Sequence, residues 1–190
     1  MKEQSQFITT EPLNSKGEAG EKLVWDAIRL AFAERKCLAY WRYPIFSPQG
    51  KFRKEPDILI ADFDLGLIII EVKAIQITQL ASIQGHRWQY QNYYTSFGNP
   101  YQQAENQLFT LLEYIDREPL LKSQVKARVL VALPYITTQQ WQQKKLDKLP
   151  TSPPILFSEH LFSIEKIVKQ IQQTVLIASG GNLNETQWQL

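Results

Sequence analysis

Three charged side chains stand at the ends of two apolar segments, where a protein core would not accept them unpaired. Asp57 directly precedes the apolar residues 58–60, and Glu71 and Lys73 follow the apolar residues 67–70. Because side chains of a strand alternate between its two faces, Glu71 and Lys73 should point to one side and Val72 to the other. Burial of unpaired charges is strongly unfavourable. The pattern therefore predicts a site where two carboxylates and an ammonium group meet.

The residue types at this site suit metal-assisted chemistry on phosphate esters. Paired carboxylates supply the hard oxygen ligands that Mg²⁺ or Mn²⁺ prefers, and they leave coordination positions for water and phosphate oxygens. A neighbouring lysine can orient the attacking water or stabilise charge during displacement at phosphorus. A salt bridge at a solvated strand end would use the same three residues, so the residues alone also leave a structural role open.

A short connection should place the two carboxylates side by side. The residues 62–64 join the segment after Asp57 to the segment before Glu71. So short a connection favours an antiparallel hairpin, in which the start of the first strand lies beside the end of the second. We therefore expect Asp57 and Glu71 to be neighbours.

Composition indicates one globular domain. The chain has 190 residues, of which 44% are hydrophobic, and its net charge of +2 gives no argument for a nucleic-acid partner. The longest apolar run, 65–70, is far below the roughly 20 residues that cross a bilayer, and residues 1–6 are polar. We therefore expect a cytoplasmic protein without a membrane partner. Cys37 should be a buried small side chain rather than part of a disulfide.

Two groups of basic residues are interpreted as ordinary solvated edges, with a track for phosphate groups as the alternative. The first group is Arg42, Lys51, Arg53 and Lys54, and the second is Lys122, Lys126 and Arg128.

The apolar periodicity predicts an α/β domain with a mixed sheet. We divide the chain into an N-terminal arm (1–14), a domain (15–178) and a flexible tail (179–190). Four helices are expected. The first follows a capping box at 15–18 and runs to about 33, and the second starts at Pro100 with Asn99 and Gln102 as its cap. The third covers 138–148, and the fourth begins after Ser158. The expected strands lie at 37–46, after Asp57, before Glu71, and at 125–133 and 155–157. A turn is expected at 47–50, and a loop region with short structured pieces at 75–98.

The aromatic run 87–94 has two interpretations. It could stack on unpaired bases while Arg87 meets phosphate, or it could be a loop packed on the core, with Trp88 as its buried member. The lone histidines His86 and His160 are expected to be ordinary polar residues.

The chain resembles the nuclease-related domain (NERD) family within the PD-(D/E)XK, restriction-endonuclease-like superfamily. The matching segments span residues 17–107. They are Gly17-Glu18-Ala19-Gly20-Glu21, Asp57, Glu71-Val72-Lys73, Gly85, Trp88 and Asn99-Pro100-Tyr101-Gln102-Gln103. The resemblance implies a single restriction-endonuclease-like domain, with a central mixed β-sheet flanked by helices, and metal-dependent cleavage of DNA by an endonuclease.

The resemblance also implies roles for the central residues. Asp57 and Glu71 would be ligands of Mg²⁺ or Mn²⁺, with the Val72 carbonyl as a third protein oxygen, and Lys73 would be the catalytic lysine. Many family members carry a small polar residue after the lysine. Here that residue is Ala74, so one supporting hydrogen bond is missing.

Two further residues are assigned by the resemblance. Glu21 would reach the metal directly or through water, and it is preferred to Glu18 because Glu18 has a local role as a cap. Gln103 would position phosphate or water, whereas Gln102 is explained by the cap formed with Asn99. A surface acid and a polar residue beside an apolar stripe are the structural alternatives for Glu21 and Gln103.

The sequence thus predicts a metal-dependent deoxyribonuclease with DNA as its partner. The alternative is a nuclease-fold module of weak or no activity that binds nucleic acid or a protein. The family domain is often joined to helicase, kinase or membrane segments, for which this chain has no room, so a protein partner could supply targeting.

Overall fold

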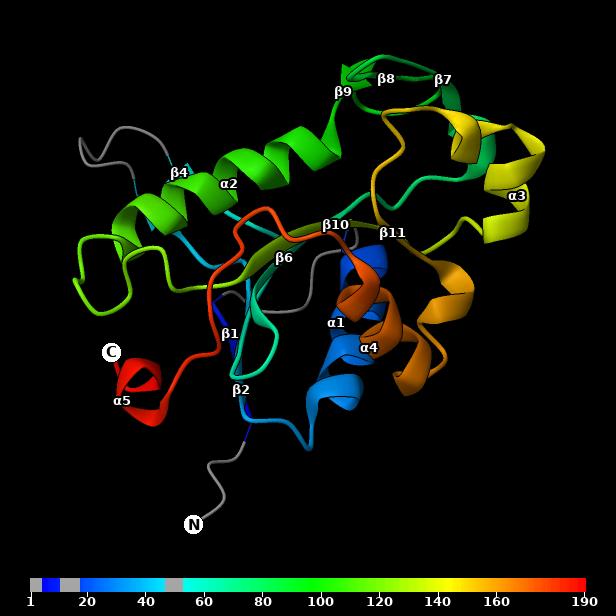
Figure 1. Ribbon diagram of the computed structural model, residues 1–190. Helices are drawn as coiled ribbons and strands as arrows, with labels where there is room; N and C mark the ends of the chain where they lie inside the picture. Colours follow the sequence, from blue (N-terminus) through cyan, green and yellow to red (C-terminus); the bar gives the residue numbers. More distant parts are fainter. Residues whose placement is uncertain (1–4, 11–17, 47–52) are drawn as a thin grey trace.

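The computed structural model describes residues 5–10, 18–46 and 53–190 and has an α/β architecture (Figure 1). A six-stranded mixed sheet lies at its centre, in the order β1-β2-β5-β6-β10-β11. Its strands are β1 (Gln6–Thr9), β2 (Cys37–Trp41), β5 (Ile58–Asp62), β6 (Gly66–Val72), β10 (Ala127–Leu133) and β11 (Ile155–Phe157). The pairs β2/β5 and β5/β6 are antiparallel, and the other neighbours are parallel. The predicted fold class, a mixed sheet flanked by helices, is confirmed.

Helices cover both faces of this sheet. Helices α1 (Ala19–Phe32) and α4 (Ile164–Gln173) pack together on one face, and α2 (Pro100–Ile115) lies across the other (Figure 1). Every residue of β6 and of β10 is buried, because both faces of these strands are covered. This explains why both strands carry nearly continuous apolar runs.

The starts of the two long helices differ in how they are capped. Asn99 caps α2 as expected, since its Oδ1 accepts the backbone N–H of Gln102 at 3.0 Å. Helix α1 begins at Ala19, and Glu18 before it makes no side-chain cap hydrogen bond. The predicted capping box needs Glu18 as the third residue of the helix, and its position before Ala19 contradicts that role. The remainder of the predicted capping box, 15–17, and the turn at 47–50 lie outside the described residues.

A small sheet replaces the loop expected at 75–98. After a short 3₁₀ turn (η1, Ile77–Gln79), strands β7 (Leu80–Gln84), β8 (Arg87–Tyr90) and β9 (Phe97–Gly98) form an antiparallel sheet. Gln84 pairs with Arg87 across a two-residue turn in which Gly85 has a φ of 58°. The sequence missed this hairpin because each strand is short and its outward residues are polar.

Left-handed backbone at two positions divides elements that were predicted as continuous. Arg42 has a φ of 57°, so β2 ends at Trp41 and the short β3 (Ile45–Phe46) pairs instead with β4 (Arg53–Lys54). Lys145 has a φ of 57°, so α3 (Thr138–Gln143) ends early and a 3₁₀ turn, η2 (Leu146–Lys148), follows. After another 3₁₀ turn, η3 (Ser158–His160), helix α4 begins at Ile164 with Ser163 as its cap, later than expected.

Both ends of the chain contain more structure than the sequence indicated. Strand β1, in the expected arm, adds a parallel strand to the edge of the main sheet. The expected flexible tail contains α5 (Glu185–Trp188), whose Trp188 ring lies 5.8 Å from the Phe63 ring. Among the described helices, none has the length and apolar content needed to span a membrane.

Candidate active site

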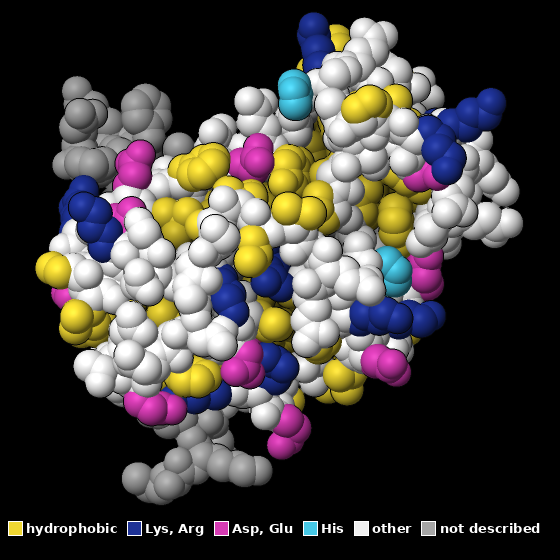
Figure 2. Space-filling model, in the orientation of Figure 1, with side chains coloured by type: hydrophobic (Ala, Val, Ile, Leu, Met, Phe, Trp, Pro, Cys, Tyr) yellow, Lys and Arg dark blue, Asp and Glu magenta, His cyan; other side chains and the backbone are white. Residues whose placement is uncertain are grey.

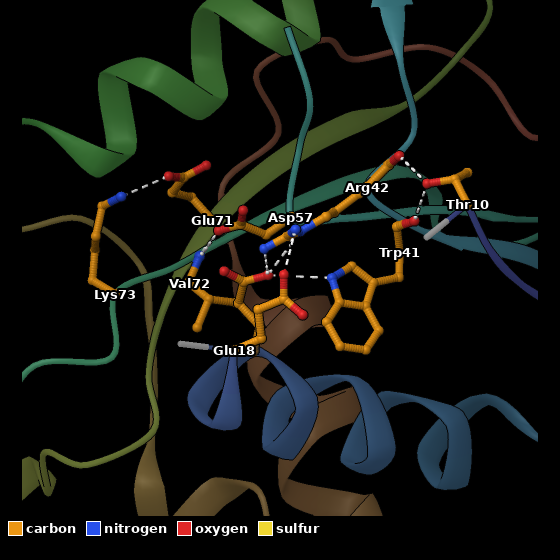
Figure 3. Close-up of polar contacts among 9 residues, drawn as sticks. Thr10, Glu18, Trp41, Arg42, Asp57, Glu71, Val72 and Lys73 are labelled. Atoms are coloured by element: carbon orange, nitrogen blue, oxygen red, sulfur yellow. Dashed lines mark hydrogen bonds and ion pairs between the residues drawn. The ribbon is translucent and has the colours of Figure 1, made fainter. Parts of the chain in front are cut away.

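Asp57, Glu71 and Lys73 meet at the end of the β5/β6 pair. Ile58 pairs with Ile70, so Asp57 stands beside Glu71 at this end. The backbone N–H of Val72 donates to Asp57 Oδ2 at 2.7 Å, and Lys73 Nζ lies 2.8 Å from Glu71 Oε1 (Figure 3). The antiparallel hairpin and the shared side of Glu71 and Lys73 are as the sequence predicted.

Burial and like charge act on both carboxyls of this site. Burial raises the pKa of Asp57 well above its ordinary value, and the nearby Glu71 and Glu21 carboxylates raise it further. Burial also raises the pKa of Glu71, although the contact with Lys73 opposes this effect. Glu71 is only 1% exposed. Two acids in such surroundings gain from any additional positive charge placed between them.

Lys73 keeps its proton in this environment. Burial by itself lowers the pKa of Lys73, but the Glu71 carboxylate, at hydrogen-bond distance, and the Asp57 carboxylate outweigh that effect. The pKa of Lys73 is consequently raised above its ordinary value. The contact with Glu71 thus favours the protonated form of Lys73.

One oxygen of Glu71 is unpaired among the described residues and is suited to bind a cation. Glu71 Oε2 is buried and has no hydrogen-bond partner among the described residues, although Oε1 is held by Lys73. An unpaired carboxylate oxygen in a buried position is unfavourable unless a ligand satisfies it. Among the side chains that the structure describes, no three His, Cys, Asp or Glu are grouped as a ready metal cluster. The fit to Mg²⁺ or Mn²⁺ therefore rests on the hard oxygens of Asp57 and Glu71 and on this orphaned atom.

Glu21 lies near the pair but is already held by other groups. Its Oε2 accepts hydrogen bonds from Trp41 Nε1 at 3.2 Å and from Arg42 Nε and Nη2 at 3.1 and 2.9 Å. Arg42 Nη1 also lies 2.5 Å from Glu18 Oε1, so one guanidinium bridges both acids at the start of α1 (Figure 3).

Arg42 connects this end of α1 to the sheet. Its backbone N–H donates to the Asp57 carbonyl at 3.0 Å, and the Thr10 hydroxyl donates to its carbonyl at 2.6 Å. The interpretation of Arg42 as part of a solvated edge is therefore wrong. The sequence gave no signal for this role, because the contacts join residues far apart in the chain.

A close approach between Gly20 and Ala74 seats α1 against the site. A Cβ atom built on Gly20 would lie 2.4 Å from the Cβ of Ala74 and 3.3 Å from Pro134 Cγ. Only small residues fit at both contacting positions. Packing against Gly20 therefore explains why the residue after Lys73 is an alanine. The same contact keeps Glu21, the next residue, at the edge of the carboxylate pair.

Gln103 is exposed in the first turn of α2, and no hydrogen bond or ion pair in the described structure joins it to Asp57, Glu71 or Lys73. Gln107, one turn later, is instead 3% exposed and donates through Nε2 to the Glu55 carbonyl at 3.0 Å. The sequence missed Gln107, although a glutamine within the apolar stripe of α2 was a signal that could have identified it.

Residues outside the central group mostly have structural roles. Trp88 is 2% exposed, as predicted, and Arg87 lies 3.6 Å over the Phe97 ring. His160 Nδ1 accepts the N–H of Phe157 at 3.2 Å, which agrees with its expected ordinary role.

Arg128, a member of the second basic group, is buried and donates to the Ile171 carbonyl at 2.8 Å. Its interpretation as part of a solvated edge is therefore also wrong. On the face shown in Figure 2, positive and negative side chains are interspersed, in keeping with a net charge near zero.

A mixed sheet flanked by helices, with two carboxylates and a lysine at the end of its central hairpin, is compatible with a nuclease-like domain. The chain matches the model of the nuclease-related domain (NERD) family over residues 16–134, which is more than half of its length. The chain therefore belongs to this family. No significant match to a curated protein or to a solved structure was found.

Proposed function

We propose that this protein is a divalent-metal-dependent nuclease that hydrolyses DNA phosphodiester bonds in the cytoplasm. The observation that carries the proposal is the pair of the partly buried Asp57 and the buried Glu71, with Lys73 bound to one oxygen of Glu71 and the other oxygen left unpaired among the described residues. Membership of the nuclease-related domain family supports it.

The carboxylates of Asp57 and Glu71 and the carbonyl of Val72 would hold Mg²⁺ or Mn²⁺. A bound ion of this kind polarises the scissile phosphate and lowers the pKa of an attacking water. The Val72 N–H fixes the orientation of Asp57 through its 2.7 Å bond to Oδ2. Glu71 brings the oxygen that lacks any other partner among the described residues.

Lys73 would act as a donor to the phosphate. Because its pKa is raised, it carries a proton throughout the neutral range and can donate to a phosphate oxygen on which negative charge develops. To do so it must share or release its 2.8 Å contact with Glu71 Oε1. Substrate binding and loosening of this ion pair would therefore be coupled.

Glu21 and Gln103 would have supporting parts. Three hydrogen bonds hold Glu21 Oε2, so we propose that Glu21 acts on the metal through a water molecule. Gln103 is exposed on the first turn of α2, where it would contact a phosphate of bound DNA.

The proposal is tested by incubating the purified protein with labelled linear, circular and single-stranded DNA, with Mg²⁺, Mn²⁺ or EDTA. We expect products only with metal, and we expect their loss in Asp57→Asn, Glu71→Gln and Lys73→Met. Glu113→Gln, an exposed acid near the other end of α2, is the matched control and should cleave normally. Metal-dependent cleavage that survives in both carboxylate variants would rule the mechanism out.

A second candidate is a binding module that keeps the fold without turnover. It is favoured by the ion pair between Lys73 and Glu71 and by the lack of a ready three-residue metal cluster among the described residues. Such a module would show salt-sensitive DNA binding in EDTA and no metal-dependent products. A protein partner that supplies targeting is compatible with either candidate.

A further inference from the structure

We propose that Tyr93 and Tyr94 form a stacking platform for an unpaired nucleobase beside the candidate active site, and that the substrate is therefore DNA with unpaired bases. This inference rests on the proposed function, because it names the form of DNA that the same site would take. It assigns the exposed end of the aromatic run to the substrate and its buried end to the core.

The two rings form the exposed end of an aromatic column. Their centroids lie 4.2 Å apart with planes inclined by 43°, and the Tyr94 side chain is 81% exposed. Tyr93 continues inward to Tyr90 at 5.4 Å, and Tyr90 to the buried Trp88 at 6.5 Å. The platform is thus supported by the core at one end, while the other end presents an aromatic surface to solvent.

Hydrogen bonds tie the platform's turn to the chain just after Lys73. Gln79 donates from Nε2 to the Asn92 carbonyl at 2.9 Å, and Gln91 donates from its backbone N–H to the Gln79 carbonyl at 2.9 Å. Gln79 belongs to η1, only six residues beyond Lys73. The small sheet stands beside the amino end of α2, and the segment that follows β6 leads into it (Figure 1).

The charges near the tyrosine pair agree with this placement. Burial and the neighbouring Tyr94 hydroxyl raise the pKa of Tyr93, and the Asp57 and Glu21 carboxylates raise it further. The tyrosine pair is therefore close to the groups that would act on the phosphate. A base stacked on Tyr94 would belong to a nucleotide near the scissile bond.

The Tyr90 hydroxyl is a polar group left unpaired beneath the platform. Tyr90 is 5% exposed, and its hydroxyl is buried with no hydrogen-bond partner among the described residues. Burial raises the pKa of this hydroxyl, and the Lys73 cation opposes that effect. Because buried hydroxyls are nearly always paired, an unpaired one directly below the Tyr93 ring is unusual.

A stacking platform selects for the state of the base. In a duplex both faces of each base are covered by its neighbours, so only an unpaired or extruded base can lie on an exposed ring. Stacking of this kind tolerates every base, because each has a π-face. The net charge of +2 provides little general attraction for DNA, so an aromatic contact would carry more of the binding.

The experiment measures binding without cleavage, in EDTA, with a single-stranded oligonucleotide that carries 2-aminopurine. Stacking on Tyr94 should quench the 2-aminopurine fluorescence of the wild-type complex. Tyr94→Ala should weaken binding by about 5- to 150-fold and abolish the quenching, because a stacked base contributes binding free energy of this order. Tyr94→Phe retains the ring and should retain both. Tyr114→Ala removes another exposed ring, 68% exposed near the far end of α2, and should change nothing.

The outcomes separate this inference from the proposed function. Equal binding and equal quenching in Tyr94→Ala would overturn the platform, even if the wild type cleaves DNA with metal. Loss of binding in Tyr94→Phe as well would also overturn it, because the ring alone would then not suffice. If Tyr94→Ala loses binding while the wild type shows no metal-dependent products, the platform stands and the nuclease proposal fails.

Discussion

Replacement of Gly20 by alanine tests how α1 is held against the site. In an ordinary helix, alanine is more stable than glycine by roughly 1 kcal/mol, so helix propensity alone predicts a gain in stability. Here the added Cβ would lie 2.4 Å from the Cβ of Ala74. The structure therefore predicts a change of the opposite sign.

The size of the loss follows from the contact distance. Carbon atoms pack best at about 3.5–4.0 Å, so α1 or the segment at Ala74 must move by more than about 1 Å to relieve the contact. Overpacking of this kind lowers the free energy of unfolding by about 1–3 kcal/mol. For a domain of this size, that corresponds to a decrease in Tm of about 2–12 °C.

Thermal unfolding followed by tryptophan fluorescence measures this effect, since Trp25 of α1 is buried. The double variant Gly20→Ala with Ala74→Gly should recover most of the loss, with a coupling energy of about 0.5–3 kcal/mol. DNA cleavage should fall in Gly20→Ala and recover in the double variant, because Glu21 moves with Gly20. A higher Tm in Gly20→Ala, or no recovery in the double variant, would show that the contact between Gly20 and Ala74 does not limit the packing of α1.

Three further predictions follow from buried charges. In the wild type, Asp62 is 1% exposed and accepts hydrogen bonds from two guanidinium nitrogens of Arg35 at 2.6 and 2.8 Å. Arg35→Ala leaves this carboxylate buried without its cation, and it should lower the free energy of unfolding, measured in urea, by about 3–5 kcal/mol. In EDTA, Asp57→Asn should raise the Tm. The pKa of Asp57 is higher in the folded state than in the unfolded chain, so this carboxyl stabilises the fold fully below about pH 4. The contribution is lost as the pH rises through the raised pKa, whereas the asparagine variant does not titrate. The difference in Tm between Asp57→Asn and wild type should therefore grow as the pH rises above about 4 and level off above the raised pKa, and a difference that does not change with pH would contradict this prediction. Mn²⁺ at about 100 times its Kd should stabilise the wild type by roughly 2.7 kcal/mol and leave the Tm of Asp57→Asn unchanged.

The centre of the fold and of the site could be predicted from local sequence patterns. Asp57, Glu71 and Lys73 lie within one hairpin, so the alternation of side chains and a short connection were enough to bring them together. The cap and buried stripe of α2 could be predicted for the same reason, because both depend on residues three or four positions apart.

Features that depend on distant contacts could not be predicted in this way. Arg42 bridges Glu18 and Glu21 only because its backbone turns left-handed at the end of β2, and nothing in its sequence neighbours indicates this. The hairpin β7–β8 was missed because its strands have too few residues to establish an alternation. Trp188 and α5 pack against Phe63, more than 100 residues earlier, and the polar sequence around them resembles a tail.

The most direct test of the central claim is a titration with Mn²⁺ followed by electron paramagnetic resonance, which counts free and bound ions. We expect Mn²⁺ to bind at the pair Asp57 and Glu71 in the wild type, and we expect this binding to be lost in Asp57→Asn and in Glu71→Gln. The control Glu113→Gln should bind as the wild type does. Equal Mn²⁺ binding in all four proteins, or no binding in the wild type with or without DNA, would contradict the claim that these carboxylates hold a divalent ion.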